Sequence, residues 1–213
     1  MGVTAENIAN DFTISRSDQD TFALDSHKKV INAESRGFFN AERLTLPVPP
    51  DYSGVLEADV GPRSDQSMAA LQKLRPYFDR KNGTVTVGNA CPLTDGAAAV
   101  VVMSESKAQS LGLSPMGYIK SFAYAGLDPT RMGLGPVYAM HRVLEKTGHK
   151  LSEMDLIEIN EAFAAQVLGC VRACADDAYC QTHMNTGKLG EINMDQLNIN
   201  GGAIALGHPV GTS

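Results

Sequence analysis

The apolar positions in the first part of the chain recur at helical spacing. A helix is predicted to begin after Ser15, whose side chain can cap it together with Asp18, and to end before Gly37. The positions that fall on its inward face are Phe22, Ala23, Ser26, Val30 and Ala33. A shorter helix is predicted from about Asp65 to Pro76, and its inward positions are Met68, Leu71 and Leu74. Residues 46–61 have several prolines and no period, so they are predicted to be a loop.

The pattern changes in the middle of the chain to short apolar and β-branched runs. Strands are predicted at residues 84–87, 97–103, 118–125 and 156–159. Helices are predicted at residues 104–111, from Pro136 to Gly148, and at 161–173. Strands that alternate with helices indicate an α/β layered fold with a largely parallel sheet. Residues 176–198 are polar and are predicted to form an extended surface connection.

Composition excludes some classes of protein. The chain is 43% hydrophobic, carries a net charge of -6, and has no apolar run near the roughly 20 residues that cross a bilayer. Nucleic-acid and membrane partners are therefore not expected, although a local basic patch could still bind a small polyanion. Four cysteines and a first segment without a basic or apolar signal region predict a reducing, cytoplasmic location.

A glycine-rich stretch near residue 208 is the most unusual part of the sequence. His208 stands between Gly207 and Pro209, and the proline restricts the backbone of the histidine to extended geometry. An imidazole that is held in this way suits a general base, because proton transfer requires a fixed position. The alternative is a glycine-rich turn with an incidental histidine.

A second candidate, Asn160, lies where a predicted strand gives way to a helix. Such junctions place polar groups at the ligand-binding edge of α/β sheets. Its amide could hold a water molecule or an oxyanion, or it could simply cap the following helix. Spacing does not separate these two roles.

Five stretches, taken together, resemble the signature motifs of the thiolase family. They are Met1-Gly2 with residues 4–7 (TAEN), residues 88–91 (GNAC) with 95–99 (DGAAA), 128–136 (DPTRMGLGP), 160–166 (NEAFAAQ) and 200–211 (NGGAIALGHPVG). They follow one another in the order of the family and extend over essentially the whole chain. One of them alone would be a weak signal.

The resemblance implies a thiolase-like layered α/β fold. Residues 1–83 would form a helical, loop-rich insertion domain, residues 84–114 the closing segment of the N-terminal core domain, and residues 115–213 an incomplete C-terminal core domain. In the family, a nucleophilic cysteine precedes these segments and an acid/base cysteine follows them. The resemblance therefore implies that residues 1–213 correspond to an interior fragment of a longer polypeptide, inactive by itself.

The resemblance also assigns roles to residues. His208 matches the histidine that activates the nucleophile, and Asn160 the asparagine that positions the water of an oxyanion hole. Coenzyme A, a substrate and not a cofactor, would contact Met1, Arg63 and Cys91. The wall of the acyl pocket would consist of Phe78, Met132, Ala162 and Phe163. No metal is implied.

Cys91 departs from the family, which usually has serine at this position. A Cys91–His208–Asn160 nucleophilic set is conceivable, but a small side chain beside the pantetheine arm is the preferred interpretation. Cys170 and Cys174 share a helix face, and with Cys180 they match no common zinc pattern, so they are predicted to pack in the core. His27 and the remaining histidines are expected to be surface or packing residues.

The predicted function is thus that of a thiolase, which makes or cleaves a 3-ketoacyl thioester of coenzyme A in a homodimer or homotetramer. A non-catalytic protein of thiolase fold that binds coenzyme A is the first alternative. A condensing enzyme of the ketoacyl-synthase type is the second, and the stretch from Asn160 to Phe163 fits it less well.

Overall fold

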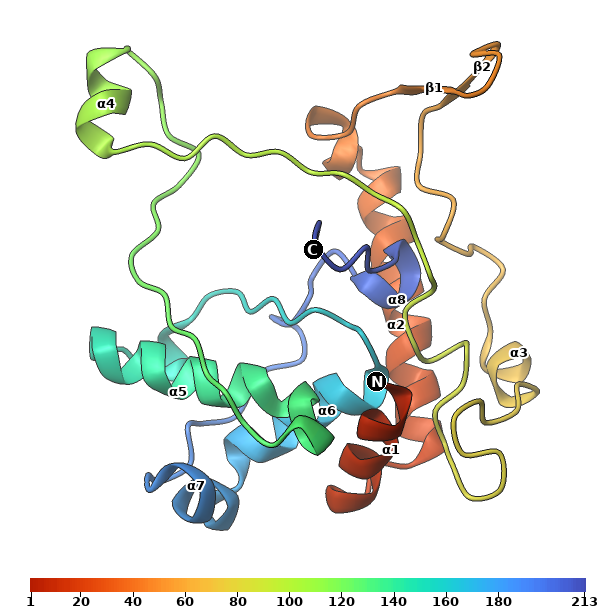
Figure 1. Ribbon diagram of the computed structural model, residues 1–213, viewed down its shortest axis with the longest axis vertical. Coiled ribbons are helices and arrows are strands. Elements are labelled where there is room, and N and C mark those ends of the chain that lie inside the picture. The colour runs from red at the N-terminus through yellow and green to blue at the C-terminus, as the bar shows by residue number, and fades with distance from the viewer.

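Helices make up most of the regular secondary structure (Figure 1). The computed structural model describes residues 1–213. Its α-helices are α1 (Gly2–Asp11), α2 (Arg16–Ser35), α3 (Met68–Gln72), α4 (Glu105–Ser110), α5 (Gly135–Thr147), α6 (Ala164–Ala175), α7 (Asp177–Met184) and α8 (Ala203–Leu206). Its short 3-10 helices are η1 (Phe38–Ala41), η2 (Pro129–Leu134) and η3 (Leu151–Glu153). One antiparallel hairpin joins β1 (Leu46–Val48) to β2 (Gly54–Leu56).

The long helix α2 confirms the first prediction. The Ser15 hydroxyl accepts from the Asp18 amide at 3.0 Å, and the Asp18 carboxylate accepts from the Ser15 amide at 3.2 Å, which completes a capping box. All five predicted inward positions are buried. Arg172 on α6 also stabilises the start of α2, because its guanidinium donates to the Asp18 carboxylate at 3.0 Å. The start of α2 is therefore fixed both locally and by a neighbouring helix.

Replacing Ser15 by alanine should lower the free energy of unfolding by about 1 kcal/mol, because one amide of the first turn of α2 loses its acceptor. Urea denaturation followed by circular dichroism measures this change. Ser17→Ala is the matched control, since Ser17 lies inside α2 and is exposed. Equal stability of both variants would show that the cap contributes nothing.

Helix α1, which was not predicted as a helix, packs against η2 and α6. Ile8 is fully buried and lies directly over Gly169 of α6, where an added Cβ would overlap its side chain. Glu6 of the same helix is buried too, and its carboxylate accepts from the amides of Thr84 and Val85 at 2.9 Å each. These contacts explain why the predicted strand at residues 84–87 does not form: the amides of Thr84 and Val85 are bound to the Glu6 side chain, and that of Thr86 is bound to the Asn89 side chain.

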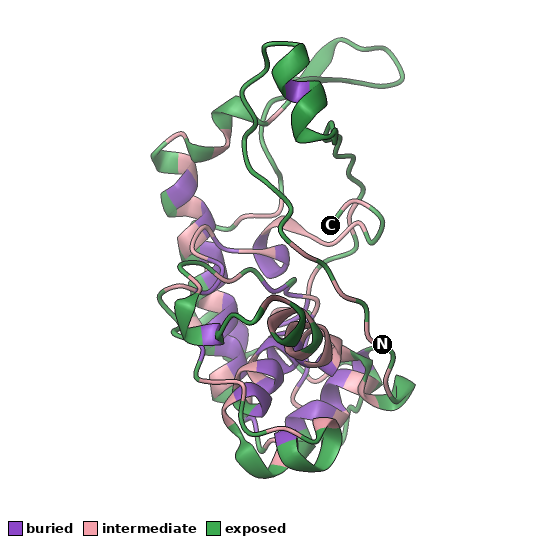
Figure 2. Cartoon of the chain, turned by 90° about the vertical axis from the view of Figure 1, so that its left-hand side faces the viewer, coloured by how far each residue is buried: buried purple, intermediate pink, exposed green.

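A single hydrophobic cluster joins the first and last thirds of the chain. It contains 22 buried residues, drawn from α1, α2 and α6 and from segments near Ala90, Ile159 and Leu197. Figure 2 shows most of the buried residues away from the end that carries the hairpin and α4, which are exposed except for Ala108. The segments that carry the candidate site run along the edge of this cluster.

The strands of the predicted parallel sheet do not pair with one another within this chain. Residues 97–103 and 118–125 are extended but mostly exposed, and no backbone hydrogen bond joins them to another segment. Val101 and Tyr124 expose 86% and 82% of their surface. A β-strand exists only when another backbone pairs with it, and no other backbone segment of this chain pairs with these runs. The prediction of strands at these two runs is therefore wrong for this chain.

Other predictions need smaller corrections. Residues 156–159 form only one bridge, in which Ile157 pairs with Leu197 in parallel. Residues 46–61 contain the β1–β2 hairpin, and α3 is shorter than predicted. Residues 176–198 are not a plain surface connection, because they include α7 and the buried side chains of Cys180, Ile192 and Leu197. Helices α4 and α5 confirm their predictions, and each ends at a glycine with positive φ, Gly112 or Gly148.

Candidate functional site

Backbone pairing brings two of the sequence motifs together. The Cys91 amide donates to the Ala162 carbonyl at 3.0 Å, and the Ala164 amide donates to the Asn89 carbonyl at 2.9 Å. Ala90 and Phe163 form an antiparallel bridge between these bonds. The pairing therefore places Cys91, a predicted coenzyme A contact, beside Ala162, a predicted part of the acyl-pocket wall.

Aromatic side chains connect the Ala90–Phe163 pairing to the start of the chain. The rings of Phe78 and Phe163 pack edge to face with their centroids 5.9 Å apart. Phe78 also lies against the backbone of Gly2, which leaves no room for a side chain there, next to Met1. Phe78 and Phe163 thus pack together, and Ala162 precedes Phe163 in the chain. Met132 lies on η2 and is 44% exposed.

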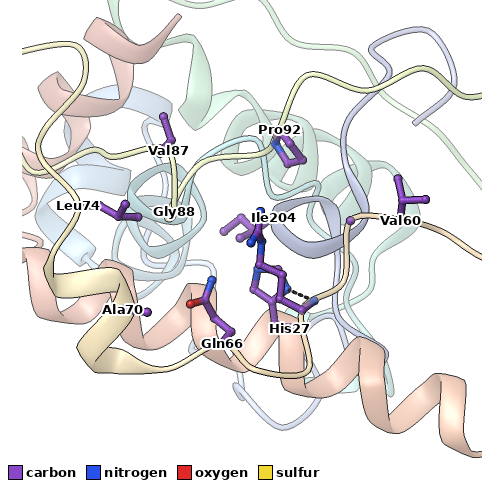
Figure 3. A pocket seen from close by; sticks show the side chains of 11 residues that line it. His27, Val60, Gln66, Ala70, Leu74, Val87, Gly88, Pro92 and Ile204 are labelled. Carbon is purple, nitrogen blue, oxygen red and sulfur yellow. Dashed lines mark hydrogen bonds between the residues drawn. The ribbon is translucent and has the colours of Figure 1, made fainter.

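A pocket of about 330 Å³ lies between α2, α3 and the segment that leads to Cys91 (Figure 3). Its lining combines polar side chains with apolar ones and consists of His27, Val60, Gly61, Arg63, Gln66, Ala70, Leu74, Val87, Gly88, Pro92 and Ile204. A neighbouring pocket of about 250 Å³ shares Arg63 and His27 and adds Lys28 and Ser64. The first pocket therefore reaches from Arg63 to Pro92, the residue after Cys91, and the second lies beside it with Lys28 in its lining.

His27 is the site residue that the sequence did not reveal. It is 5% exposed, and its Nδ1 accepts from the Arg63 amide at 3.2 Å (Figure 3). Burial, and secondarily the charge of Arg63, lower the pKa of His27 below its ordinary value. His27 is therefore neutral near pH 7 and fixes the backbone of the arginine. Nothing in its spacing could have indicated this role, because its partner is 36 residues away.

His208 follows the short helix α8 and is held from both sides by the segment after Cys91. The side chain of Thr94 lies against Gly207, which has φ +102° and no room for a Cβ. An added Cβ at Gly96 would lie 2.7 Å from Pro209. Nδ1 of His208 is buried and has no hydrogen-bond partner. The two residues that flank His208 are thus packed against a distant segment of the chain.

Asn160 is exposed and does not cap α6, whose N-cap residue is Phe163. The capping alternative for Asn160 is therefore wrong, because the turn between Asn160 and the helix is three residues longer than a cap allows. The adjacent Glu161, by contrast, is 1% exposed. Asn160 thus projects from a turn whose next residue is anchored in the core.

The cysteines differ in how far burial suppresses their ionisation. Burial raises the pKa of the Cys91 thiol above its ordinary value, which argues against Cys91 as a nucleophile. Burial raises the pKa of Cys170 and Cys174 to about 12, and both lie in the core cluster. The prediction that these two pack in the core is confirmed.

At neutral pH, Cys91 should react with iodoacetamide more slowly than a free cysteine, because its raised pKa leaves less thiolate. The rate should increase as the pH rises toward that pKa. Cys170 and Cys174 should remain unmodified in the folded chain and react only in urea. Mass spectrometry of peptides after timed alkylation measures all three rates. Rapid alkylation of Cys91 at pH 7 would contradict this account and revive its nucleophilic role.

Comparison with known proteins accounts for this arrangement. Residues 1–106 match the family described as "Thiolase, N-terminal domain", and residues 113–213 match "Thiolase, C-terminal domain". The chain belongs to the thiolase family. It is 45% identical over 211 residues to a 3-ketoacyl-CoA thiolase of Yersinia enterocolitica, covering 98% of this chain and 48% of that protein. A 3-ketoacyl-CoA thiolase of Yersinia pestis is 44% identical over the same length, with the same shares of both chains covered.

Solved structures show the same relationship. A Bacillus anthracis acetyl-CoA acetyltransferase superimposes with a TM-score of 0.87 and 38% identity, covering 100% of this chain and 50% of that one. An acetyl-CoA acetyltransferase from Syntrophomonas wolfei gives a TM-score of 0.84 at 35% identity, covering 100% of this chain and 51% of that one. The thiolase-like layered fold is therefore confirmed, although its sheet is unpaired here. The thiolase chain spans about half the length of the curated relatives it matches. None of its helices is both long and apolar enough to cross a membrane.

Proposed function

We propose that this chain supplies the coenzyme A pocket and the activating histidine of a thiolase that makes or cleaves 3-ketoacyl-CoA. The observation that supports this most directly is the pocket of about 330 Å³, which connects Arg63 to the residue after Cys91. A basic end suits the phosphates of the nucleotide, and a narrow mixed lining suits the pantetheine arm. The pairing of the Cys91 segment with Ala162 then leads to the packed rings of Phe163 and Phe78.

Each predicted residue receives a place along this route. Arg63 binds phosphate at the basic end, helped by the neutral His27 that fixes its backbone. Cys91 and Met1 lie beside the pantetheine arm. The thioester and its acyl chain extend along Phe78, Met132, Ala162 and Phe163, the expected wall of the acyl pocket. Coenzyme A acts here as a substrate, so no cofactor is required.

His208 takes the proton from the nucleophilic cysteine in this proposal. Its Nδ1 is buried, which leaves Nε2 as the nitrogen for proton transfer. Protonated, the imidazole donates to the thioester oxygen as negative charge develops there. Asn160 is exposed at the edge of its turn and can hold the water molecule that supplies a second donor. Both cysteines of the reaction are expected outside the segments that this chain matches.

A second candidate function, binding of coenzyme A without catalysis, rests on the same pocket. In this alternative the pocket binds coenzyme A and no acyl transfer follows. A homodimer or homotetramer remains part of the proposal for the active enzyme. Activity of an assembly that includes this chain separates the two functions.

Arg63→Ala should weaken binding of coenzyme A by about tenfold to a hundredfold, the range expected for one charge-assisted hydrogen bond to phosphate. Isothermal titration of the isolated chain measures this affinity. Arg75→Ala is the matched control, because Arg75 is also exposed and does not line the pocket.

The same titration with pantetheine, which lacks the nucleotide, should show no difference between wild type and Arg63→Ala. If the arginine mattered equally for pantetheine, it would not be the phosphate contact. If the wild-type chain bound neither ligand, the pocket would not be a coenzyme A site in the isolated chain.

A further inference from the structure

Glu161, the residue next to Asn160, is a buried carboxylate with no role in the proposed reaction. It is 1% exposed and bonds three separate segments. Its Oε2 accepts from the Ser26 hydroxyl of α2 at 2.6 Å and from the Ile204 amide of α8 at 3.2 Å. Its Oε1 accepts from the Asn198 side-chain amide at 2.9 Å. One side chain thus ties α2 and the two ends of the 198–204 segment to the turn at residue 160.

Gly202 packs closely against the carboxylate of Glu161. An added Cβ at Gly202 would lie 2.6 Å from the carboxyl carbon of Glu161. The amide of Gly202 donates to the Ser26 hydroxyl at 3.2 Å, and that hydroxyl in turn donates to Glu161. The glycine-rich segment is therefore shaped around Glu161, both by space and by a hydrogen-bond chain.

Every group that bonds Glu161 is a donor, and two of these donors cannot be reversed: the backbone amide of Ile204, which can only donate, and the side-chain amide of Asn198. Asn198 is fixed because its Oδ1 accepts from the Ile159 amide at 2.8 Å and its Nδ2 also donates to the Ile159 carbonyl at 2.8 Å. A side chain at position 161 must therefore offer two acceptor oxygens. Burial raises the pKa of Glu161, while the bonds from Ser26, Asn198 and Ile204 oppose that rise by favouring the ionised form.

The anchored segment leads directly to the candidate site. Ile204, whose amide binds Glu161, also lines the pocket (Figure 3). The carbonyl of the next residue, Ala205, lies against Gly61 of the same pocket and leaves no room there for a side chain. Four residues after Ile204 comes His208. Displacing this segment would thus move the pocket wall and the histidine together.

We propose that Glu161 is a positioning residue, whose carboxylate holds the glycine-rich segment against the Asn160 turn and so sets the places of His208 and of the pocket wall. Its functional meaning rests on the proposed coenzyme A site. The anchoring itself can be measured without ligand, in the chain alone.

The test replaces Glu161 by glutamine, which has the same shape but only one acceptor oxygen. In either orientation, the new NH2 group faces an N–H donor, that of Asn198 or that of Ile204. Amide hydrogen exchange at Ile204 should become about tenfold faster or more, while the buried amides of Val167 and Cys170 keep their protection. The ring signals of His208 in the ¹H–¹³C spectrum should shift and broaden. Glu158→Gln, an exposed change in the same segment, should alter neither.

A milder variant keeps the test decisive if Glu161→Gln fails to fold. Ser26→Ala removes only the hydroxyl that links Glu161 to Gly202, and it should also speed exchange at Ile204 with the core protection unchanged. Glu161→Asp should restore part of the protection, because it retains two acceptors. The proposal is overturned if the folded Glu161→Gln chain, or Ser26→Ala where that chain does not fold, shows wild-type exchange at Ile204 and unchanged His208 ring signals.

Binding of coenzyme A separates this proposal from the proposed function. If the wild-type chain binds coenzyme A, Glu161→Gln should weaken that binding about tenfold, because Ile204 is part of the pocket. If the wild-type chain does not bind coenzyme A, the proposed function fails while the exchange data still decide the role of Glu161. If Glu161→Gln exchanged faster at Ile204 but bound coenzyme A as tightly as wild type, Glu161 would only stabilise the fold. Its proposed role in positioning the site would then be wrong.

Discussion

Replacing His208 by alanine should lower kcat at least about a hundredfold and leave KM little changed, because both proposed roles of the imidazole act in the transition state. Without it, the nucleophilic cysteine is not converted to thiolate and the thioester oxygen loses a donor. The two losses fall in the same step, so they need not multiply. The assay requires a complete enzyme, for example a chimera in which residues 1–213 replace the matching segment of the Yersinia enterocolitica thiolase.

Two further variants of the chimera sharpen this test. Asn160→Ala should reduce kcat less than His208→Ala, since Asn160 acts through a water molecule. His149→Ala is the control, because His149 is exposed just after the end of α5 and pairs with Glu153 at 3.1 Å. The loss of His208 should also slow alkylation of the nucleophilic cysteine by iodoacetamide. If turnover and alkylation both stayed near wild type, His208 would be structural and its catalytic assignment wrong.

The isolated chain should show no thiolysis of acetoacetyl-CoA, whereas the chimera should be active. The family resemblance places the nucleophilic cysteine and the acid/base cysteine outside the segments matched here, and Cys91 is a poor substitute because burial raises its pKa. The reaction is monitored through the loss of absorbance of the 3-ketoacyl thioester as acetyl-CoA is released. Binding of coenzyme A by the same inactive chain would show that the pocket and the chemistry reside in separate parts of the enzyme.

One result would reverse this expectation. Turnover by the purified chain that survives Cys91→Ser would mean that a group within residues 1–213 other than Cys91 performs the acyl transfer. Turnover that disappears in Cys91→Ser would instead establish Cys91 as the nucleophile, with His208 as its base. An inactive chimera would favour the non-catalytic alternative.

The sequence by itself determined the elements whose stability is local. The cap at Ser15 and the inward face of α2 were both predictable, because helical hydrogen bonds and capping groups lie within a few residues of one another. The glycines that end α4 and α5 were predictable for the same reason. The motifs that carry His208 and Asn160 also identified the family, since each is a contiguous stretch of the chain.

Only the tertiary structure decided which distant groups meet. The sequence does not show that Glu6 binds the amides of residues 84 and 85, that His27 holds Arg63, or that Glu161 joins α2 to the glycine-rich segment. These partners are 36 to 135 residues apart, and a buried polar group takes whichever partner the packing places beside it. Strand pairing has the same origin: residues 97–103 and 118–125 carry the apolar pattern of buried strands, but a pattern cannot supply the neighbouring backbone that makes a sheet.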